Sequence, residues 1–350
     1  MHYIQIIYFR TMIILRKLLF PFAMLYGVIT SIRNFLYNQG VLKSYSFPIP
    51  IIAVGNLSVG GTGKTPHIEY LIRLLSVDYN IAVLSRGYKR KSKGFILANK
   101  NSTAEILGDE PYQIFQKFPQ IHVAVDVDRK NGIEQLLKLE NQPEVILLDD
   151  AFQHRRVKAG FYVLLTAYDD LYCDDFILPT GNLRESGKGS KRADLIIVTK
   201  CTIAISKEEM DHITKKLRTS KKVFFSTIAY DDFVYNENNS LSINEIKSKE
   251  KLLLAGIAKP ALFFDYLKQS NDEVMAFPDH HHFTDNDIKN INNKAKNKVI
   301  ITTEKDYVRL NNHTLQSDIY YLPIKSKFLS GGDDFNKTIK NYVGTSTRNS

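Results

Sequence analysis

The sequence has very few cysteines, and this scarcity excludes several classes of small protein. Its 350 residues contain 2 cysteines, Cys173 and Cys201, and no tryptophan. Two thiols are too few for a four-cysteine zinc site or for a disulfide framework, and they fit a reducing compartment. Because 44% of the residues are apolar and 24% are charged, the chain can instead build a core by hydrophobic burial.

Negative charge is missing from the first part of the chain. No Asp or Glu precedes Glu69, although the chain as a whole carries 37 acidic residues. The cations among residues 1–46 are Arg10, Arg16, Lys17, Arg33 and Lys43. These five supply half of the formal net charge of +10. Such a balance favours phosphates, nucleic acids or anionic membrane surfaces as partners, without choosing among them.

The same basic segment lacks an apolar run long enough for a straight transmembrane helix. Its longest uncharged run, Leu18–Ile32, has 15 residues, whereas a spanning helix needs about 20. A secretory signal is a poor match because cations recur after the apolar part. We therefore expect a segment that lies in the membrane interface, divided at Pro21 and Gly27 into two helical pieces. The alternative is a helical hairpin that packs on the protein's own core.

Beyond Phe47, short apolar runs that resemble buried strands alternate with helical patterns. From Ile68 to Leu75, for example, apolar residues recur at intervals of three and four. This alternation predicts an α/β fold in which a mostly parallel sheet carries helices on both faces. The predicted strands are Ile49–Val54, Ile81–Leu84, Val145–Leu148, Tyr162–Leu165, Leu195–Val198 and Val223–Phe225.

A second, smaller α/β unit is expected nearer the C-terminus. Its predicted strands are Leu252–Ala255, Val299–Thr302 and Ile319–Leu322, and the polar stretch Asn236–Glu250 before them resembles a linker. The expected division of the chain is a membrane-associated helical segment at 1–46, a larger domain at 47–225, a smaller domain at 226–335 and a polar tail at 336–350.

The strongest chemical signal is a glycine-rich loop between a predicted strand and a predicted helix. Its residues are Ser58, Val59, Gly60, Gly61, Thr62, Gly63, Lys64 and Thr65. Glycines let backbone N–H groups converge on phosphate oxygens at a helix N-terminus. Lys64 would reach the β- and γ-phosphates, and Thr65 would ligate Mg²⁺. Ser58 stands where the usual pattern has glycine. A glycine-rich turn with an exposed lysine is the alternative to a nucleoside triphosphate site.

Two acids follow the predicted strand Val145–Leu148. Asp149 and Asp150 would then lie at the carboxyl end of a parallel strand, beside the phosphate loop. Carboxylates in that position can hold Mg²⁺ directly or through water. The alternative is an aspartate that caps the next turn. Because the phosphate loop is already present, the metal role is favoured.

Four further clusters are individually weaker. Asp109 opens a predicted helix and could simply cap it. Arg86, in a basic turn after a strand, would suit a phosphorylated substrate, and Arg184 in a loop could clamp phosphate through both of its terminal nitrogens. The three consecutive histidines at 280–282 would point to alternate faces of an extended chain, so joint metal binding is disfavoured. A general base or orienting role for one of them is more plausible.

Seven motifs together resemble the tetraacyldisaccharide 4′-kinase family, the lipid A 4′-kinases. They occur in the family's order between Val54 and Asp306. The motifs are V-G-N-L-S-V-G-G-T-G-K-T-P (54–66), S-R-G-Y (85–88), G-D-E-P (108–111), D-D-A-F-Q-H (149–154), N-L-R-E (182–185), F-P-D-H (277–280) and T-T-E-K-D (302–306).

The resemblance implies a P-loop kinase-type domain at 47–225 that uses ATP and Mg²⁺. The implied reaction phosphorylates the 4′-hydroxyl of a lipid A disaccharide 1-phosphate, giving lipid IVA. It would take place at the cytoplasmic face of the bacterial inner membrane, with the protein peripheral or monotopic. No nucleic acid and no obligate protein partner are expected.

The resemblance also assigns residues to this reaction. Asp109 would accept the proton of the sugar hydroxyl with support from His280, and Lys64, Asp149 and Asp150 would complete the catalytic group. Further site residues by resemblance are His154 and Glu185. Candidates for the substrate's phosphate are Arg86, Arg184 and Arg155.

Two other functions remain open on the sequence. One is a membrane-bound P-loop nucleotide switch or ATPase that acts through a partner. The other is a nucleic-acid-associated ATPase, suggested by the positive charge. The second is disfavoured because half of that charge lies in the apolar N-terminal segment and no aromatic-and-basic binding motif is present.

Overall fold

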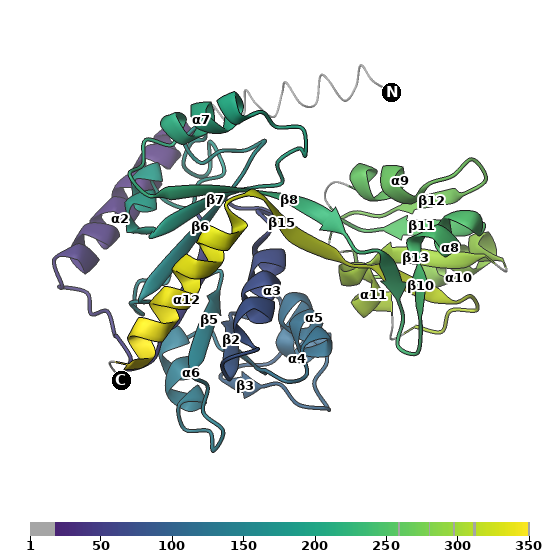
Figure 1. Cartoon of the computed structure of the whole chain (residues 1–350), viewed down its shortest axis with the longest axis horizontal. Helices are drawn as coiled ribbons and strands as arrows, with labels where there is room; N and C mark the ends of the chain where they lie inside the picture. Colours follow the sequence, from purple (N-terminus) through teal and green to yellow (C-terminus); the bar gives the residue numbers. More distant parts are fainter. Residues whose placement is uncertain (1–17, 258–259, 280, 297, 311–312, 349–350) are drawn as a thin grey trace.

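The computed structural model describes residues 18–257, 260–279, 281–296, 298–310 and 313–348. Two α/β units of unequal size lie side by side, and an antiparallel pair of strands runs from one into the other (Figure 1). Both units are built on mostly parallel sheets, which confirms the predicted α/β class. Every strand predicted from the sequence is present.

The larger sheet has nine strands in the described part of the chain. Their spatial order is β15-β8-β7-β6-β1-β5-β2-β4-β3, and the central strands from β8 to β4 are parallel. The bounds are β1 Ile51–Asn56, β2 Ile81–Ser85, β3 Ile96–Leu97, β4 His122–Val125, β5 Val145–Asp149, β6 Phe161–Ala167, β7 Leu195–Thr199, β8 Lys222–Tyr230 and β15 Ile324–Ser330. The edge strands β15 and β3 are antiparallel to their neighbours.

Helices cover both faces of this sheet because its strands are apolar on both sides. Along β1, Ile52 and Val54 face one core cluster, whereas Ile51 and Ala53 face another. The first face is covered by α3 (Lys64–Leu75), α5 (Asp109–Lys117) and α12 (Gly332–Arg348). The opposite face is covered by α6 (Arg129–Leu136) and α7 (Lys207–Lys216). The short elements α4 (Ala104–Leu107) and η1 (Gly187–Arg192) lie in connections.

The smaller sheet has six strands among the described residues, in the order β10-β9-β14-β13-β11-β12. The bounds are β9 Phe233–Tyr235, β10 Ser240–Ser242, β11 Lys251–Ala255, β12 Glu273–Ala276, β13 Val299–Thr303 and β14 Ile319–Leu322. Helices α8 (Ile243–Ser248) and α9 (Ala261–Leu267) pack on one face. Helices α10 (Asp285–Ala295) and α11 (Glu304–Leu310) contribute to the core on the other face.

The chain enters the smaller unit through β8 and returns through β15. Tyr230 is paired with Ile324 at the far end of this ribbon, so the crossing lies beyond residue 230 on the way out and before residue 324 on the way back. The expected boundaries at 226 and 335 therefore cut through the ribbon and α12. The expected linker at 236–250 is also wrong, because β10 and α8 occupy most of it.

The expected polar tail at 336–350 is wrong for its described part. Residues 332–348 form α12, which returns over the larger unit, as the yellow helix in Figure 1 shows. Phe335, Ile339 and Val343 recur every four residues and are fully buried in the core below it. The polar residues around this narrow stripe face solvent, which made the helix look like a tail in the sequence.

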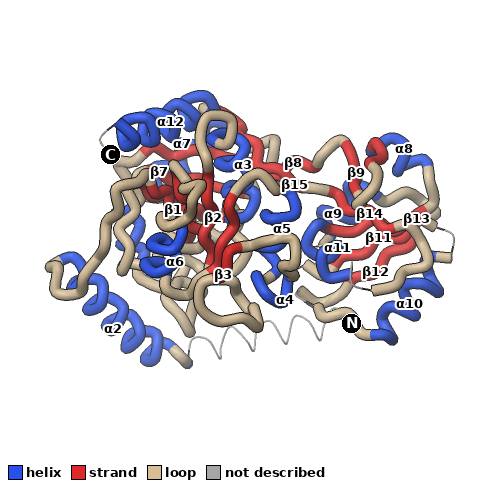
Figure 2. Tube along the Cα trace, turned by 90° about the horizontal axis from the view of Figure 1, so that it is seen from below, coloured by secondary structure: helices blue, strands red, loops and turns tan. Residues whose placement is uncertain are grey.

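Helix α2 (Phe20–Asn38) lies on the outside of the larger unit, on the side away from the smaller unit (Figures 1 and 2). It is one continuous helix, so the expected break at Gly27 is wrong; Pro21 sits in its first turn, where a missing N–H costs nothing. In the described part of the chain, no helix is long and apolar enough to cross a bilayer. Arg10, Arg16 and Lys17 lie outside the described residues.

Candidate active site

The loop between β1 and α3 has the backbone of a phosphate-binding loop. Gly60 and Gly63 adopt positive φ angles of 112° and 81°, which side chains other than glycine rarely tolerate. Gly63 is the N-cap of α3 and Lys64 is its first residue, so the N–H groups and positive dipole end of a 12-residue helix open onto this loop. Thr65 follows and is half-buried.

Neighbouring segments hold both limbs of the loop. The backbone N–H of Val59 donates to the carbonyl of Asn182 at 2.8 Å, and Ser58 forms a bridge with Leu183. This extended pairing is open to any residue, which explains why Ser58 can replace the usual glycine. On the other limb, the Thr199 hydroxyl donates to the carbonyl of Thr62 at 2.8 Å. Gly61, between these two held parts of the loop, is exposed.

The two predicted acids lie beside this loop because β5 is the parallel neighbour of β1. Val54 is paired with Asp149 in the sheet. Asp150 follows in a left-handed conformation (φ 46°), and its carboxylate lies 3.7 Å from Lys64 Nζ. Arg184 Nη1 donates to both oxygens of this carboxylate at 2.9 Å. Burial alone would raise the pKa of Asp150, but Lys64 and Arg184 hold it below its ordinary value.

The pKa of Asp149 is shifted in the opposite direction. Burial, together with the charges of Glu110 and Asp150, raises its pKa to about 6. Its Oδ2 accepts a hydrogen bond from the Ser85 hydroxyl at 3.0 Å. Its Oδ1 is buried and has no hydrogen-bond partner among the residues that the structure describes. A buried carboxylate oxygen without a donor is a natural ligand for a cation, so this donor set fits Mg²⁺.

The described residues contain no group of three or more His, Cys, Asp or Glu side chains that could hold a metal unaided. Magnesium sites of phosphoryl-transfer enzymes commonly use one or two carboxylates together with phosphate oxygens and water.

Two arginines, Arg129 and Arg86, lie close to Asp149 and Asp150. Arg129, the first residue of α6, is 2% exposed and donates to the backbone carbonyl of Asp149 at 3.1 Å. Burial, reinforced by the charges of Arg129 and Arg86, lowers the pKa of His154 to about 4. His154 is therefore neutral near pH 7. A cavity of about 290 Å³ opens here and is lined in part by Arg129 and His154.

Asp109 is the first residue of α5, and the structure shows what it contacts. The N-cap position belongs to Gly108, which corrects the simple capping alternative. The Asp109 carboxylate instead accepts hydrogen bonds from Arg309 Nη2 at 2.6 Å and Arg309 Nε at 3.0 Å. Arg309 belongs to α11, so this contact joins the two units. His280, the expected partner of Asp109, lies outside the described residues.

Two residues expected in the site have contacts with α2. Glu185 is 2% exposed; it pairs with Arg192 at 2.7 Å and accepts a hydrogen bond from Asn34 Nδ2 at 2.7 Å. Arg155 donates to the carbonyl of Asn34 at 2.7 Å and to the side chain of Asn38 at 2.7 Å. These contacts fasten α2 to the loops that follow β5 and β6. A direct role for either residue in the reaction stays a prediction.

Comparison with known proteins agrees with this geometry. The model of one protein family, described as tetraacyldisaccharide-1-P 4′-kinase, matches residues 15–344. The chain belongs to this family. It is 63% identical to a tetraacyldisaccharide 4′-kinase of Flavobacterium psychrophilum, over 96% of this chain and 99% of that protein. A relative of the same name from Bacteroides thetaiotaomicron is 46% identical over 96% and 95% of the two chains.

A solved family member has the same architecture. The crystal structure of the "apo" form of LpxK from Aquifex aeolicus in complex with ATP superimposes with a TM-score of 0.77 at 32% identity. The match covers 94% of this chain and 99% of that one. The two-unit arrangement is therefore a feature that this chain shares with another 4′-kinase of known structure.

Sequence reasoning missed three residues that the fold places at the site of this 4′-kinase family member. Arg309 and Arg129 carried no local signal, because each acts on a residue far away in the sequence. His67 lies buried in α3, with Nδ1 2.8 Å from the carbonyl of Gly63. Burial lowers its pKa to about 4, so His67 is a neutral ring that donates from Nδ1 to the phosphate loop.

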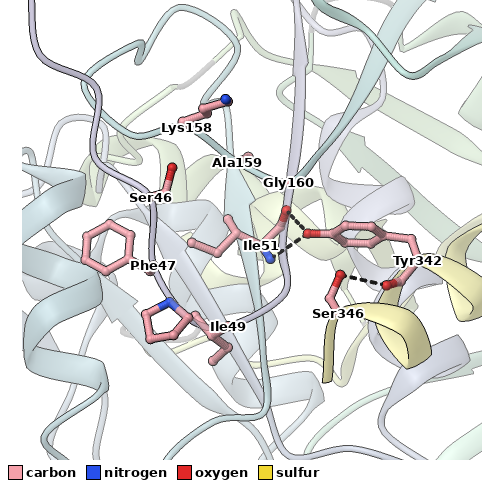
Figure 3. Close-up of a pocket in the computed structure, with 10 residues that line it drawn as sticks. Ser46, Phe47, Ile49, Ile51, Lys158, Ala159, Gly160, Tyr342 and Ser346 are labelled. Carbon is pink, nitrogen blue, oxygen red and sulfur yellow. Dashed lines mark hydrogen bonds between the residues drawn. The ribbon is translucent and has the colours of Figure 1, made fainter. Parts of the chain in front are cut away.

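A second cavity lies away from the phosphate loop. Its volume is about 300 Å³, and it sits beneath α12 near the start of β1 (Figure 3). The Tyr342 hydroxyl accepts a hydrogen bond from the N–H of Ile51 and donates to its carbonyl. These contacts tie α12 to the amino end of β1, opposite the edge that carries the site, so this cavity belongs to the packing of the C-terminal helix.

Proposed function

We propose that the edge formed by the phosphate loop, the end of β5 and the start of α5 carries out the reaction of the family in this chain. The chain is a lipid A 4′-kinase: it phosphorylates the 4′-hydroxyl of tetraacyldisaccharide 1-phosphate at the expense of ATP, giving lipid IVA. The single observation that carries the site assignment is the meeting of Lys64, Asp149 and Asp150 at one sheet edge.

ATP would bind with its phosphates in the loop from Gly60 to Thr65. The backbone N–H groups at the start of α3 surround that position, and the dipole of α3 favours negative charge there. Lys64 is 12% exposed and already faces the edge where phosphate would lie. Its ammonium would stabilise the charge that spreads over the transferring phosphoryl group.

Mg²⁺ would be held by Thr65, Asp149 and Asp150. A magnesium ion held by these residues would supply positive charge beside the phosphates during transfer. The unpartnered Oδ1 of Asp149 supports this placement, as does the lowered pKa of Asp150, which keeps that side chain anionic. Replacement of each acid by Asn distinguishes the one that would ligate the ion directly.

The acceptor hydroxyl would approach from the side of α5. A sugar hydroxyl releases its proton late in phosphoryl transfer, so a carboxylate within reach assists the reaction. Asp109 is the proposed proton acceptor, with His280 as its helper. Arg86 is exposed at the same edge, and together with Arg184 it is a candidate to bind the substrate's phosphate. The two cations would also restrict the orientation of the sugar.

Membrane attachment would use α2, in which the apolar side faces away from the protein and the small or polar side faces it. The side facing the body of the protein carries small or polar residues, Ala23, Gly27, Thr30 and Asn34. The opposite side exposes large apolar residues, among them Leu25, Ile29 and Ile32, each more than 50% exposed. A solvent-facing apolar stripe of this kind fits the headgroup–acyl boundary. The protein would lie on the cytoplasmic face of the inner membrane.

The test is a product assay. The protein is incubated with ATP, Mg²⁺ and tetraacyldisaccharide 1-phosphate in mixed micelles, and the lipid is analysed for a second phosphate at the 4′ position. We expect stoichiometric conversion of ATP to ADP and bis-phosphorylated lipid. Hydrolysis of ATP at a rate that does not respond to the lipid would support the nucleotide-switch alternative instead.

A further inference from the structure

The starting observation is a pair of ionic contacts between α5 of the larger unit and α11 of the smaller unit. Asp109, the first residue of α5, meets Arg309 near the end of α11. Lys117, the last residue of α5, meets Glu304, the first residue of α11, at 2.6 Å. The two helices are therefore antiparallel and are connected at both ends, so docking of the smaller unit determines how α5 lies.

Contacts within the smaller unit hold the guanidinium of Arg309 in place, independently of Asp109. Its Nη1 lies 3.2 Å from Asp306 Oδ1. Asp306 is completely buried, and its Oδ2 accepts hydrogen bonds from the N–H of Gly256 at 2.8 Å and the hydroxyl of Thr303 at 2.7 Å. The Arg309 side chain is 8% exposed. A side chain so restricted loses little entropy when it makes its next contact.

The contacts of Arg309 argue against a role as a phosphate ligand. Nε and Nη2 both donate to the same oxygen, Oδ2 of Asp109, and Nη1 faces Asp306. All three nitrogens of the guanidinium are therefore directed at carboxylates. A fork of donors converging on one oxygen restricts rotation of the Asp109 carboxylate and fixes which oxygen is turned away from Arg309.

We propose that Arg309 is a positioning residue for phosphoryl transfer. The smaller unit, through Arg309, holds the Asp109 carboxylate in the orientation that receives the proton of the acceptor hydroxyl. This proposal rests on the proposed function, in which Asp109 is the proton acceptor. It gives the smaller unit a specific part in the chemistry, because the reactive orientation of Asp109 exists only while α11 is docked on α5.

The main test replaces Arg309 in the full-length protein. R309M keeps an unbranched apolar stem and removes the guanidinium donors, so kcat with lipid should fall about 10- to 100-fold, the range expected when a reacting group loses its alignment. KM for ATP should stay within about twofold, because the described contacts of Arg309 are with Asp109 and Asp306 rather than with the phosphate loop. R309K should recover part of the loss, since it restores the charge without the fork.

Further variants separate this proposal from the proposed function. If D109N keeps near-normal activity, the proton-acceptor role of Asp109 is wrong. If D109N is inactive and R309M is as active as the parent, the positioning role is wrong while the proposed function stands. The double variant D109N/R309M should be little slower than D109N alone, because the effects of substituting residues that act as one unit are not additive. A full multiplication of the two losses would overturn the proposal.

Two more variants test the anchoring of Arg309 and the specificity of the loss. D306N keeps a side chain of the same shape under Arg309 but removes the charge, so a smaller fall in kcat should appear without a change in KM for ATP. K298M removes a cation from a surface ion pair with Glu273 on the same unit, and its kcat should be unchanged. Apparent Tm is measured for all variants. A D306N variant that folds and reacts like the parent would contradict the anchoring step.

Discussion

The ammonium of Lys64 lies 3.7 Å from the carboxylate of Asp150, and this contact joins the phosphate loop to the end of the neighbouring strand. Asp150 is in turn clamped by Arg184, so loop, strand and the segment at 182–184 form one charged unit. The fold thus brings three motifs that are far apart in the sequence to one edge of the larger sheet.

Replacing Lys64 by Ala should reduce kcat at least about 100-fold, because charge stabilisation of the transferring phosphoryl group is lost. The measurement is 4′-phosphorylation of the lipid in mixed micelles, with apparent Tm recorded to confirm folding. Lys91→Ala is the matched control, since Lys91 forms an exposed pair with Glu105. Near-parent activity of Lys64→Ala would remove this residue from the mechanism.

Replacing Asp149 or Asp150 by Asn should increase the Mg²⁺ concentration needed for half-maximal activity. The larger increase is expected at the acid that ligates the ion directly, because Asn supplies one neutral oxygen in place of a carboxylate. Titration of Mg²⁺ at saturating ATP measures both variants. Two unchanged titration curves would show that the magnesium assignment is wrong.

Replacing Leu25, Ile29 and Ile32 together by Gln should detach the protein from membranes. Each buried apolar side chain contributes about 1.5–3 kcal/mol, so vesicle binding should weaken at least about tenfold per residue. Binding to vesicles containing anionic phospholipid is measured by co-sedimentation. KM for lipid should rise while KM for ATP does not. Val77→Gln, at an 82% exposed position after α3, is the control. Continued sedimentation of the triple variant would assign attachment to another surface.

Glu304 provides a prediction on pH. Burial and the nearby charge of Glu69 raise its pKa from 4.5 to about 7, although Lys117 opposes this. Between pH 4.5 and 7 the folded chain thus retains a proton that the unfolded chain releases, so stability falls as pH rises through this window and levels off above it.

Glu304→Gln mimics the protonated side chain and should remove this dependence. Its apparent Tm should exceed that of the parent by a few degrees at pH 8, and the gap should close near pH 5. Glu105→Gln, at an exposed ion pair, is the control. A lower Tm than the parent at pH 8 would mean that the attraction between Lys117 and ionised Glu304 outweighs the cost of burial.

Several features of this protein were determined by short stretches of sequence. The spacing of Gly60, Gly63 and Lys64 is sufficient for the phosphate loop, because the loop is built from consecutive backbone N–H groups. Buried strands are apolar on both faces, so they could be recognised one by one. Helix α12 was not predicted, although Phe335, Ile339 and Val343 have helical spacing. These three apolar residues are few among many polar ones, and they belong to a core only because the larger sheet lies beneath the helix.

The roles of individual charged residues were decided by the tertiary structure. Asp109 and Arg309 are 200 residues apart in the chain, and no local pattern relates them. Glu185 is a predicted site residue, and the fold adds a contact that its motif does not reveal, between its carboxylate and Asn34 of α2. The physical reason is the same in each case. A strand or a glycine loop depends on its own residues, whereas the partner of a charged side chain depends on which distant element the fold brings within about 3 Å of it.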